Sequence, residues 1–382
     1  MNKFFDTLWA YRNKVTNKLF GVVKVRHKGN KVGNILLSYI TEPFTIALHE
    51  QRSLLHSNYQ ECWVIADIFS KKGYDVDVIN ATNTIFIPKK HYAFLIDIKS
   101  NIERLRKMLP NTTMIMHIVE SHHSFHNKAE QNRLEQLHKR RGVNLKRRRV
   151  TEPHQNAEKA DHLEGLGNEH THSTYSHIHK DIYSIPISTT VHFKSPTHKN
   201  FDAIRKNFLW IGGGGAVHKG LDILLELFNK MPDYTLHICG PVHSEKDFAN
   251  LYKKELFKTK NIHFHGRISP GSKEFKEITN NTLAVVYPSS SEGQAGSVIT
   301  AMHAGIIPII SKESGINSNN FGITLENCTE EEIRKEIEFI STLPTQTLKQ
   351  MSLNTWEYAN THHTIETFKK HYEDFVTNIL HI

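Results

Sequence analysis

The stretch IGGGGAVHKGLDILLELF, residues 211–228, indicates how the second half of the chain folds. Four consecutive glycines follow an apolar run with the pattern of a buried strand, and an apolar stripe at helical spacing begins after Lys219. Glycines let the main chain approach a ligand that side chains would exclude. The helix that follows offers N–H groups at its positive end, where Lys219 adds a full charge. The stretch therefore predicts a seat for a diphosphate, with a plain flexible turn as the alternative.

Short apolar strands alternate with helical segments on both sides of this stretch. In the second half, helices are expected to open near Lys219, Asp247, Lys273, Gly296 and Thr329. A weaker form of the same alternation runs through the first half from Asn34 onward. Such alternation is typical of parallel sheets covered on both faces, in which ligands bind beyond the carboxyl ends of the strands. The sequence therefore predicts an α/β protein of two doubly wound, Rossmann-like domains facing across a cleft.

The expected domain boundaries follow the same pattern. The first domain is placed at residues 1–190 and the second at 207–355, and the polar segment 189–207 contains Pro196 and is taken as the linker. Residues 356–382 are expected to form a helix that packs back on the first domain. Residues 1–30 have the composition of a basic amphipathic helix, which either lies on an anionic membrane surface or packs on its own domain.

Composition narrows the class of protein. The 382 residues carry a formal net charge of +9 with 27 neutral histidines, which favours an anionic partner. No apolar run approaches the ~20 residues that cross a bilayer, and the N-terminus has no signal-peptide pattern. Three cysteines lie far apart and form neither a metal pattern nor a disulfide framework. We expect a cytoplasmic protein, and peripheral contact with the inner face of a membrane is a further expectation.

A second constellation, VVYPSSSEGQAGSVITAMHAGIIPIIS at residues 285–311, follows another buried strand. It places Glu292 just before a helix that starts near Gly296. A carboxylate beside an anion seat is not a phosphate ligand, because like charges repel. It suits a neutral polyhydroxylated group attached to that phosphate. A sugar diphosphate matches both halves of this requirement.

Together these residues resemble the retaining family 4 glycosyltransferases, which have the GT-B fold, of the kind found in bacterial surface-polysaccharide biosynthesis. The resemblance covers residues 207 to about 322 and rests on HKG at 218–220, ICG at 238–240, NIHFHGRI at 261–268 and the constellation above. It implies that Lys219 holds the donor's diphosphate and that Glu292 hydrogen-bonds the donor sugar. The helix start at Gly296 and Ser297 would complete the seat.

The expected donor site also includes Arg267, which the resemblance places beside the base. The full set is Gly213, Gly214, Gly215, His218, Lys219, Gly240, Arg267, Ser291, Glu292, Gly293, Gly296, Ser297 and Thr300. Two positions depart from the family pattern. Gly214 stands where an arginine is usual and Thr300 where a second glutamate grips the ribose. Either other groups such as His218 hold the donor, or the donor is not a conventional nucleotide sugar, or the protein is an inactive relative.

The first domain is expected to bind the acceptor. The resemblance implies a histidine facing the donor sugar at the end of the strand at 113–119, so His117 or His122 is the candidate. A cleft histidine can exchange protons near neutral pH, and the alternative is an ordinary surface histidine. His56 and Asn58 are weaker candidates.

Three further motifs are assigned structural roles. DVD at 75–77 lies inside a strand and is interpreted as ordinary alternation. HTHSTYSHIH at 170–179 lacks the spacing that closes a zinc site, so no metal is expected. HKRRGVNLKRRR at 138–149 has no interleaved aromatics, so a solvated helix face or a dock for anionic lipid is favoured over nucleic acid.

The resulting hypothesis is a metal-independent, retaining glycosyltransferase that needs no cofactor. It would move a sugar from a nucleotide-diphosphate donor to a hydroxyl of a glycan or lipid-linked acceptor. Two alternatives remain open. One is a sugar-nucleotide epimerase with the same fold, and the other is a non-catalytic basic scaffold that binds membrane or nucleic acid.

Overall fold

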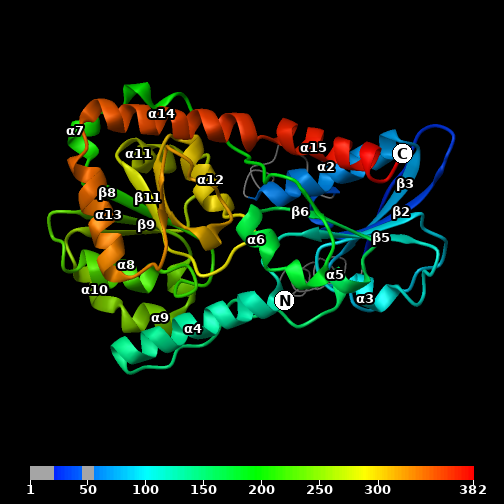
Figure 1. The fold of residues 1–382 in the computed structure, drawn as a ribbon, viewed down its shortest axis with the longest axis horizontal. Helices are drawn as coiled ribbons and strands as arrows, with labels where there is room; N and C mark the ends of the chain where they lie inside the picture. The colour runs from blue at the N-terminus through cyan, green and yellow to red at the C-terminus, as the bar shows by residue number, and fades with distance from the viewer. Residues whose placement is uncertain (1–20, 45–55) are drawn as a thin grey trace, which may run out of the picture.

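The computed structural model describes residues 21–44 and 56–382, which form two α/β domains beside one another (Figure 1). The elements of the first domain are β1 (Val22–Val25), β2 (Gly33–Tyr39), α2 (Ser57–Lys71), β3 (Tyr74–Asn80), β4 (Phe94–Asp97), α3 (Asn101–Leu105), β5 (Thr113–Ile118), α4 (His123–Arg141), α5 (Asn156–Lys159), β6 (His162–Gly165), α6 (Glu169–Ser173) and β7 (Ile182–Ser184).

The first domain is built on a seven-stranded sheet of order β1-β3-β2-β4-β5-β6-β7. Its strands pair in parallel except β1, which is antiparallel to β3. In β2, Ile35 and Leu37 pack in one apolar cluster with α2, whereas Leu36 packs in another on the opposite face with α3. This alternation follows from the two-residue period of a strand, and it means that both faces of the sheet are covered.

The second domain repeats this plan with an all-parallel six-stranded sheet of order β10-β9-β8-β11-β12-β13. Its elements are α7 (Phe201–Ile204), β8 (Asn207–Ile211), α8 (Leu221–Phe228), β9 (Thr235–Cys239), α9 (Lys246–Leu251), α10 (Lys253–Lys258), β10 (Ile262–Gly266), α11 (Lys273–Asn280), β11 (Ala284–Tyr287), α12 (Gly296–His303), β12 (Ile307–Ser311), β13 (Ile323–Leu325) and α13 (Glu330–Thr342). The strands predicted as apolar runs in this half are all present.

The C-terminal helices connect the two domains (Figure 1). α14 (Thr345–His362) contacts α12 of the second domain, and α15 (Ile365–Asn378) contacts α2 of the first. The crossover was expected at residue 356, which falls inside α14. The structure places it at His363, a buried residue whose Nδ1 donates to the carbonyl oxygen of Ile187 at 3.0 Å.

α4 also leaves the first domain and extends along the second (Figure 1). It ends at Gly142, whose φ of 70° is the left-handed conformation that commonly terminates helices. Residues 143–150 then continue without regular structure, so the run 138–149, interpreted as a helix face, is helical only as far as Arg141.

The basic run at 138–149 is therefore not a free face. Its arginines form ion pairs with acidic side chains of the second domain: Arg140 with Asp222 and Glu226, Arg141 with Glu226 and Glu255, and Arg148 with Asp247. The interpretation as a solvated helix face or a lipid dock is therefore wrong, because these charges are already paired within the protein. The sequence did not show this, because the acidic partners lie far away along the chain.

Two other predictions concern segments near the N-terminus. Residues 1–20 of the expected amphipathic segment lie outside the described residues, while Val22–Val25 form the strand β1 rather than helix. Asp75 and Asp77 of the DVD motif pair with Arg26, Lys31 and Lys90, as part of an ordinary strand. None of the helices in the described parts of the chain combines the length and apolar character that crossing a bilayer requires.

Candidate active site

A cavity of ≈ 480 Å³ lies between the two domains. The second domain contributes the turns that follow β8, β9, β10 and β11, which is where parallel sheets bind ligands. The predicted donor-site residues that line this cleft are Gly213, Gly214, Lys219, Gly240, Arg267, Glu292, Gly296, Ser297 and Thr300. The sequence therefore brings most of the expected donor site to one wall.

Lys219 and Glu292 form an ion pair in this wall and are almost buried, with exposed fractions of 6% and 9%. Lys219 Nζ also donates to the hydroxyl of Tyr287 at 2.9 Å. Glu292 Oε1 accepts from the hydroxyls of Tyr287 at 2.9 Å and Ser289 at 3.0 Å. Tyr287 and Ser289 were not predicted, although the strand and serine turn that carry them were.

The two charges of this pair support one another. Burial alone would raise the pKa of the Glu292 carboxyl, but the positive charges of Lys219 and Arg149 outweigh burial and hold that pKa below its usual range. Burial lowers the pKa of Lys219, against the attraction of Glu292. We expect the charged pair to persist at neutral pH, because the carboxylate accepts three hydrogen bonds at one oxygen.

The glycine turn after β8 is only partly available to a ligand. A side chain at Gly213 would meet no atom within 4 Å, and one at Gly214 would meet only Glu245 Oε1 at 3.8 Å. Gly215 is different, since its N–H donates to Glu245 Oε1 at 2.6 Å and it does not line the cleft. Gly215, predicted as part of the donor site, therefore does not present its N–H to the cleft, because the carboxylate of Glu245 already accepts it.

α12 begins inside the cleft, with Gly296 and Ser297 in its first turn. The N–H groups of a first helical turn have no partner within the helix, so those of Gly296 and Ser297, which line the cleft, are candidate donors to an anion. The Ser297 hydroxyl donates to the carbonyl oxygen of Ile211 at 3.0 Å. The Thr300 hydroxyl donates to the carbonyl oxygen of Gly296 at 2.8 Å, so it does not replace the missing carboxylate.

His218, Ser291 and Gly293 belong to the contact between the domains rather than to the cleft. His218 Nε2 donates to the carbonyl oxygen of Ser291 at 2.7 Å, and the Ser291 hydroxyl lies 3.0 Å from His126 Nδ1 of α4. A side chain at Gly293 would come within 2.2 Å of the carbonyl oxygen of Val119. These three donor-site predictions are wrong, because the turn around Glu292 is also where the first domain docks.

His117 is not a cleft residue either. It is fully buried in β5, and its Nδ1 lies 2.7 Å from the carboxylate of Glu164 in β6. Coulombic attraction to Glu164 opposes the effect of burial and raises the pKa of the imidazole. The prediction that His117 faces the donor sugar is therefore wrong, because strand alternation turns this side chain into the domain interior.

His122 caps the start of α4 outside the cleft, where it packs against other histidines. Burial and the neighbouring imidazoles of His123, His177 and His154 lower its pKa to about 4. Its prediction as a cleft acid or base is wrong, because the turn after β5 directs it away from the donor wall. Across residues 21–44 and 56–382, one group of three potential metal ligands occurs, formed by His122, Glu158 and His177.

The opposite wall of the cleft comes from the first domain. His56, Asn58 and Glu120 line it. Burial is the main cause that lowers the pKa of His56, and the nearby positive charge of Arg267 lowers it further, so this imidazole is neutral at pH 7. His56 thus lies near Arg267, the residue expected to contact the nucleotide base. Arg149 lines the cleft as well. The sequence placed it only in the basic run 138–149, more than sixty residues before the glycine turn, and did not indicate this position.

Comparison with known proteins agrees with this arrangement. Residues 202–357, which include the whole donor wall of the second domain, match the family described as Glycosyl transferases group 1. Comparison of the sequence with curated proteins gives no match.

Solved structures share the fold at low sequence identity. Sucrose-phosphate synthase from Thermosynechococcus elongatus has a TM-score of 0.60 at 14% identity, over 91% of this chain and 99% of that one. Anabaena HepE, in complex with UDP and glucose, has a TM-score of 0.57 at 11% identity, over 91% and 100%. S. aureus TarM, in complex with fondaparinux, alpha-GlcNAc-glycerol and UDP, has a TM-score of 0.51 at 16% identity, over 73% of this chain. The matched part spans about half of TarM, 54% of its length.

These similarities confirm the predicted fold class of two Rossmann-like domains across a cleft. Residues 202–357 therefore match the Glycosyl transferases group 1 family, and the whole chain shares the fold of these solved structures.

Proposed function

We propose that the protein transfers a sugar from a nucleoside-diphosphate sugar to a hydroxyl of a glycan or lipid-linked acceptor, with retention of anomeric configuration and without a metal ion. The observation that carries the proposal is the Lys219–Glu292 pair in the wall of the cleft, beside the start of α12. The complexes of HepE and TarM with UDP support a nucleotide donor by similarity of fold. Membership of family 4, and with it retention, rests on the resemblance of sequence motifs.

Each member of the pair has capacity left for a donor. An ammonium has three N–H donors, and two of those of Lys219 are used by Glu292 and Tyr287. The third can reach a diphosphate oxygen. The three hydrogen bonds to Glu292 all go to Oε1, so Oε2 is the oxygen that can accept from a sugar hydroxyl.

The reaction follows from where charge develops. When the bond between the anomeric carbon and the diphosphate oxygen breaks, the bonding electrons leave with the diphosphate. Lys219 and the N–H groups at the start of α12 stabilise that charge as it appears, which is the largest single contribution in many enzymes. The acceptor hydroxyl loses its proton as it attacks. Glu120 and the neutral His56 of the opposite wall are the cleft groups that can take it.

A thermal-shift panel of UDP, GDP, ADP and CMP sugars tests the donor. We expect one donor to raise the melting temperature, and Lys219→Met and Glu292→Gln to abolish that rise. The same donor should be hydrolysed slowly without acceptor, with a chelator making no difference. NMR of the released sugar then separates transfer from epimerisation, which would instead return an epimer of the intact donor. Indifference of the unaltered protein to every nucleotide sugar would favour the scaffold alternative and end this proposal.

We also propose, from sequence alone, that the protein works on the cytoplasmic side at a membrane surface and that the basic, aromatic segment 1–20 provides the contact. Co-sedimentation with anionic phospholipid vesicles should depend on this segment. Equal binding of the full chain and a chain lacking residues 1–20 would contradict it.

A further inference from the structure

We propose that Arg149 binds the diphosphate of the donor, so that a residue of the first half of the chain supplies the second cation of a site built on the second domain. This inference rests on the proposed function and names a ligand that the donor motifs do not include.

Arg149 lies across the glycine turn of the second domain. A Cβ atom built on Gly215 would come within 2.7 Å of Arg149 Cγ and 3.1 Å of Cδ, so the arginine side chain runs directly over that backbone. Arg149 lines the interdomain cleft together with Gly213, Gly214 and Lys219. The glycine at 215 is thus explained by its left-handed backbone, with a φ of 91°, and by the arginine that passes over it.

The backbone of Arg149 is held by two buried side chains of α4. Glu130 Oε1 accepts from the N–H groups of Arg148 at 2.7 Å and Arg149 at 2.8 Å. His126 Nε2 donates to the carbonyl oxygen of Arg149 at 2.6 Å. Glu130 and His126 are only 2% and 1% exposed. Such a clamp fixes where residue 149 lies, which an ordinary surface arginine would not need.

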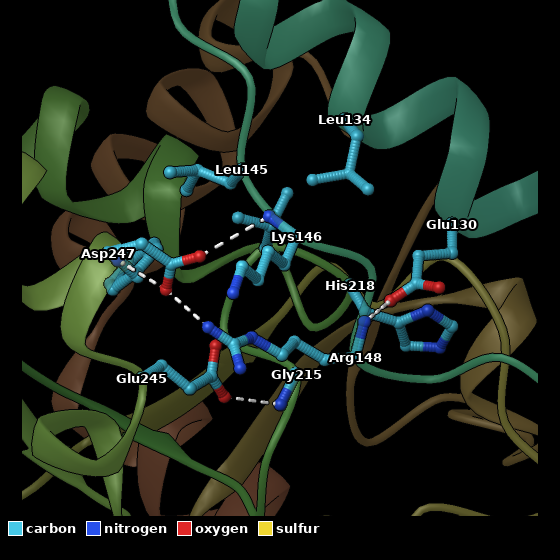
Figure 2. Close-up of a pocket in the computed structure, with 11 residues that line it drawn as sticks. Glu130, Leu134, Leu145, Lys146, Arg148, Gly215, His218, Glu245 and Asp247 are labelled. Carbon is cyan, nitrogen blue, oxygen red and sulfur yellow. Dashed lines mark hydrogen bonds and ion pairs between the residues drawn. The ribbon is translucent and has the colours of Figure 1, made fainter.

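The side chains of the two preceding arginines, Arg147 and Arg148, are already paired with carboxylates. Figure 2 shows Arg148 directed at Asp247, while Glu130 accepts from the Arg148 backbone N–H. The Arg147 side chain pairs with Glu130. The side chain of Arg149 makes no hydrogen bond or ion pair with any residue in 21–44 or 56–382, and its Nε atom is buried without a partner. Because a buried donor without an acceptor costs free energy, this position is suited to an anion that arrives from outside.

The charges around the cleft wall fit a diphosphate. Arg149 and Lys219 are both close enough to Glu292 to lower the pKa of its carboxyl. Two cations with one carboxylate leave a single positive charge, to which the N–H groups of α12 add, facing the two negative charges of a sugar nucleotide's diphosphate. A guanidinium binds phosphate oxygens through two parallel N–H groups, a geometry that lysine lacks. Gly214, where the sequence pattern would place an arginine, therefore needs no side chain here.

Isothermal titration calorimetry with UDP, GDP and ADP, and with the matching nucleosides, tests the proposal. We expect Arg149→Gln to weaken binding of the preferred nucleoside diphosphate about ten- to hundredfold, because a charge-assisted hydrogen bond is lost. Binding of the nucleoside should change by less than about twofold, because Arg149 does not touch the base. Arg148→Gln is the matched control and should keep diphosphate affinity, while Arg149→Lys should fall between Arg149→Gln and the unaltered protein.

The possible outcomes separate this inference from the proposed function. If the unaltered protein binds a nucleoside diphosphate and Arg149→Gln binds it equally well, only the role of Arg149 is refuted. If Arg149→Gln weakens nucleoside and diphosphate equally, or lowers the melting temperature where Arg148→Gln does not, the residue is structural and the inference also fails. If the unaltered protein binds none of the three, the nucleotide donor is refuted and this inference falls with it.

Discussion

Among single residues, Lys219 and Glu292 both lie in the wall of the cleft and stabilise one another's charge. Both are nearly buried, and each is the other's principal charge partner. Removing one partner of a buried pair leaves the other charge without compensation, which is more damaging than losing both. We expect Lys219→Ala to lower the free energy of unfolding by about 3 kcal/mol, measured by urea denaturation at neutral pH.

The double variant is the control for this expectation. Lys219→Ala combined with Glu292→Ala should recover part of the loss, since no unpaired carboxylate then remains beside Tyr287. If the loss of unfolding free energy in the double variant equals the sum of the losses in the two single variants, the side chains do not stabilise one another and the ion pair does not contribute to stability.

Two glycines of the site region make a second test at this scale. Gly293 approaches the carbonyl oxygen of Val119 so closely that a Cβ would lie 2.2 Å from it, whereas Gly213 has no atom within 4 Å of such a Cβ. Gly293→Ala should therefore push the domains apart and cost about 2 kcal/mol of unfolding free energy in urea, while Gly213→Ala stays near neutral. Equal stability of the two variants would mean that the domains do not meet at Gly293.

At the scale of elements, α15 fastens the C-terminus to the first domain. Phe368, Tyr372, Phe375 and Val376 are all fully buried, in the same cluster as residues of α2 and β2. Removing the Phe375 ring should cost about 3–5 kcal/mol in urea unfolding, since it leaves a cavity. The exposed Phe339 of α13 provides the control, and Phe339→Ala should change stability by less than about 0.5 kcal/mol. A small effect of Phe375→Ala would place α15 outside the core.

The elements also show how far local sequence can predict this molecule. Strands such as Asn207–Ile211 and Ala284–Tyr287 were predicted because buried parallel strands are continuous apolar runs between helices. Lys219, Glu292 and Gly296 were placed correctly in the cleft because each lies between the end of such a strand and the start of the next helix, or at that start. The stop of α4 at Gly142 was missed, because the charged pattern continues beyond it.

The remaining errors have a common physical origin. Whether His117 points to the cleft or to the interior is decided by one step of strand alternation, which a lone sequence does not fix. α4 lies along the second domain (Figure 1), and its Glu130 and His126 hold the backbone of Arg149 beside the glycine turn. Ser291 contacts His126 of the same helix, and Gly293 packs against the carbonyl oxygen of Val119. Contacts between domains leave no local pattern, so these roles required the three-dimensional structure.

For the whole molecule, two buried histidines join segments that must meet for the cleft to exist. His218 holds the turn around Ser291, and His363 holds the crossover between α14 and α15 to Ile187. Both are almost inaccessible, with exposed fractions of 1% and 2%. Burial lowers the pKa of each to about 3, so both are neutral in the folded protein at any pH near 7.

This linkage predicts how stability depends on pH. The unfolded chain takes up protons at these positions below about pH 6.5, whereas the folded protein does not until about pH 3. The contribution of the two neutral histidines to the free energy of unfolding is therefore fully present above pH 6.5. It is lost as the pH falls from 6.5 toward 3, by about 1.4 kcal/mol per pH unit for each histidine. Urea unfolding between pH 7.5 and 5 should show this slope.

His363→Asn isolates one of the two groups, because an asparagine N–H can still donate to Ile187 but does not titrate. The slope of unfolding free energy against pH below 6.5 should become shallower by about 1.4 kcal/mol per unit in this variant. His243→Asn, at an exposed position, should leave the slope unchanged. An unaltered slope in His363→Asn would mean that His363 accepts a proton in the folded protein, which is possible only if the crossover between the domains opens to solvent.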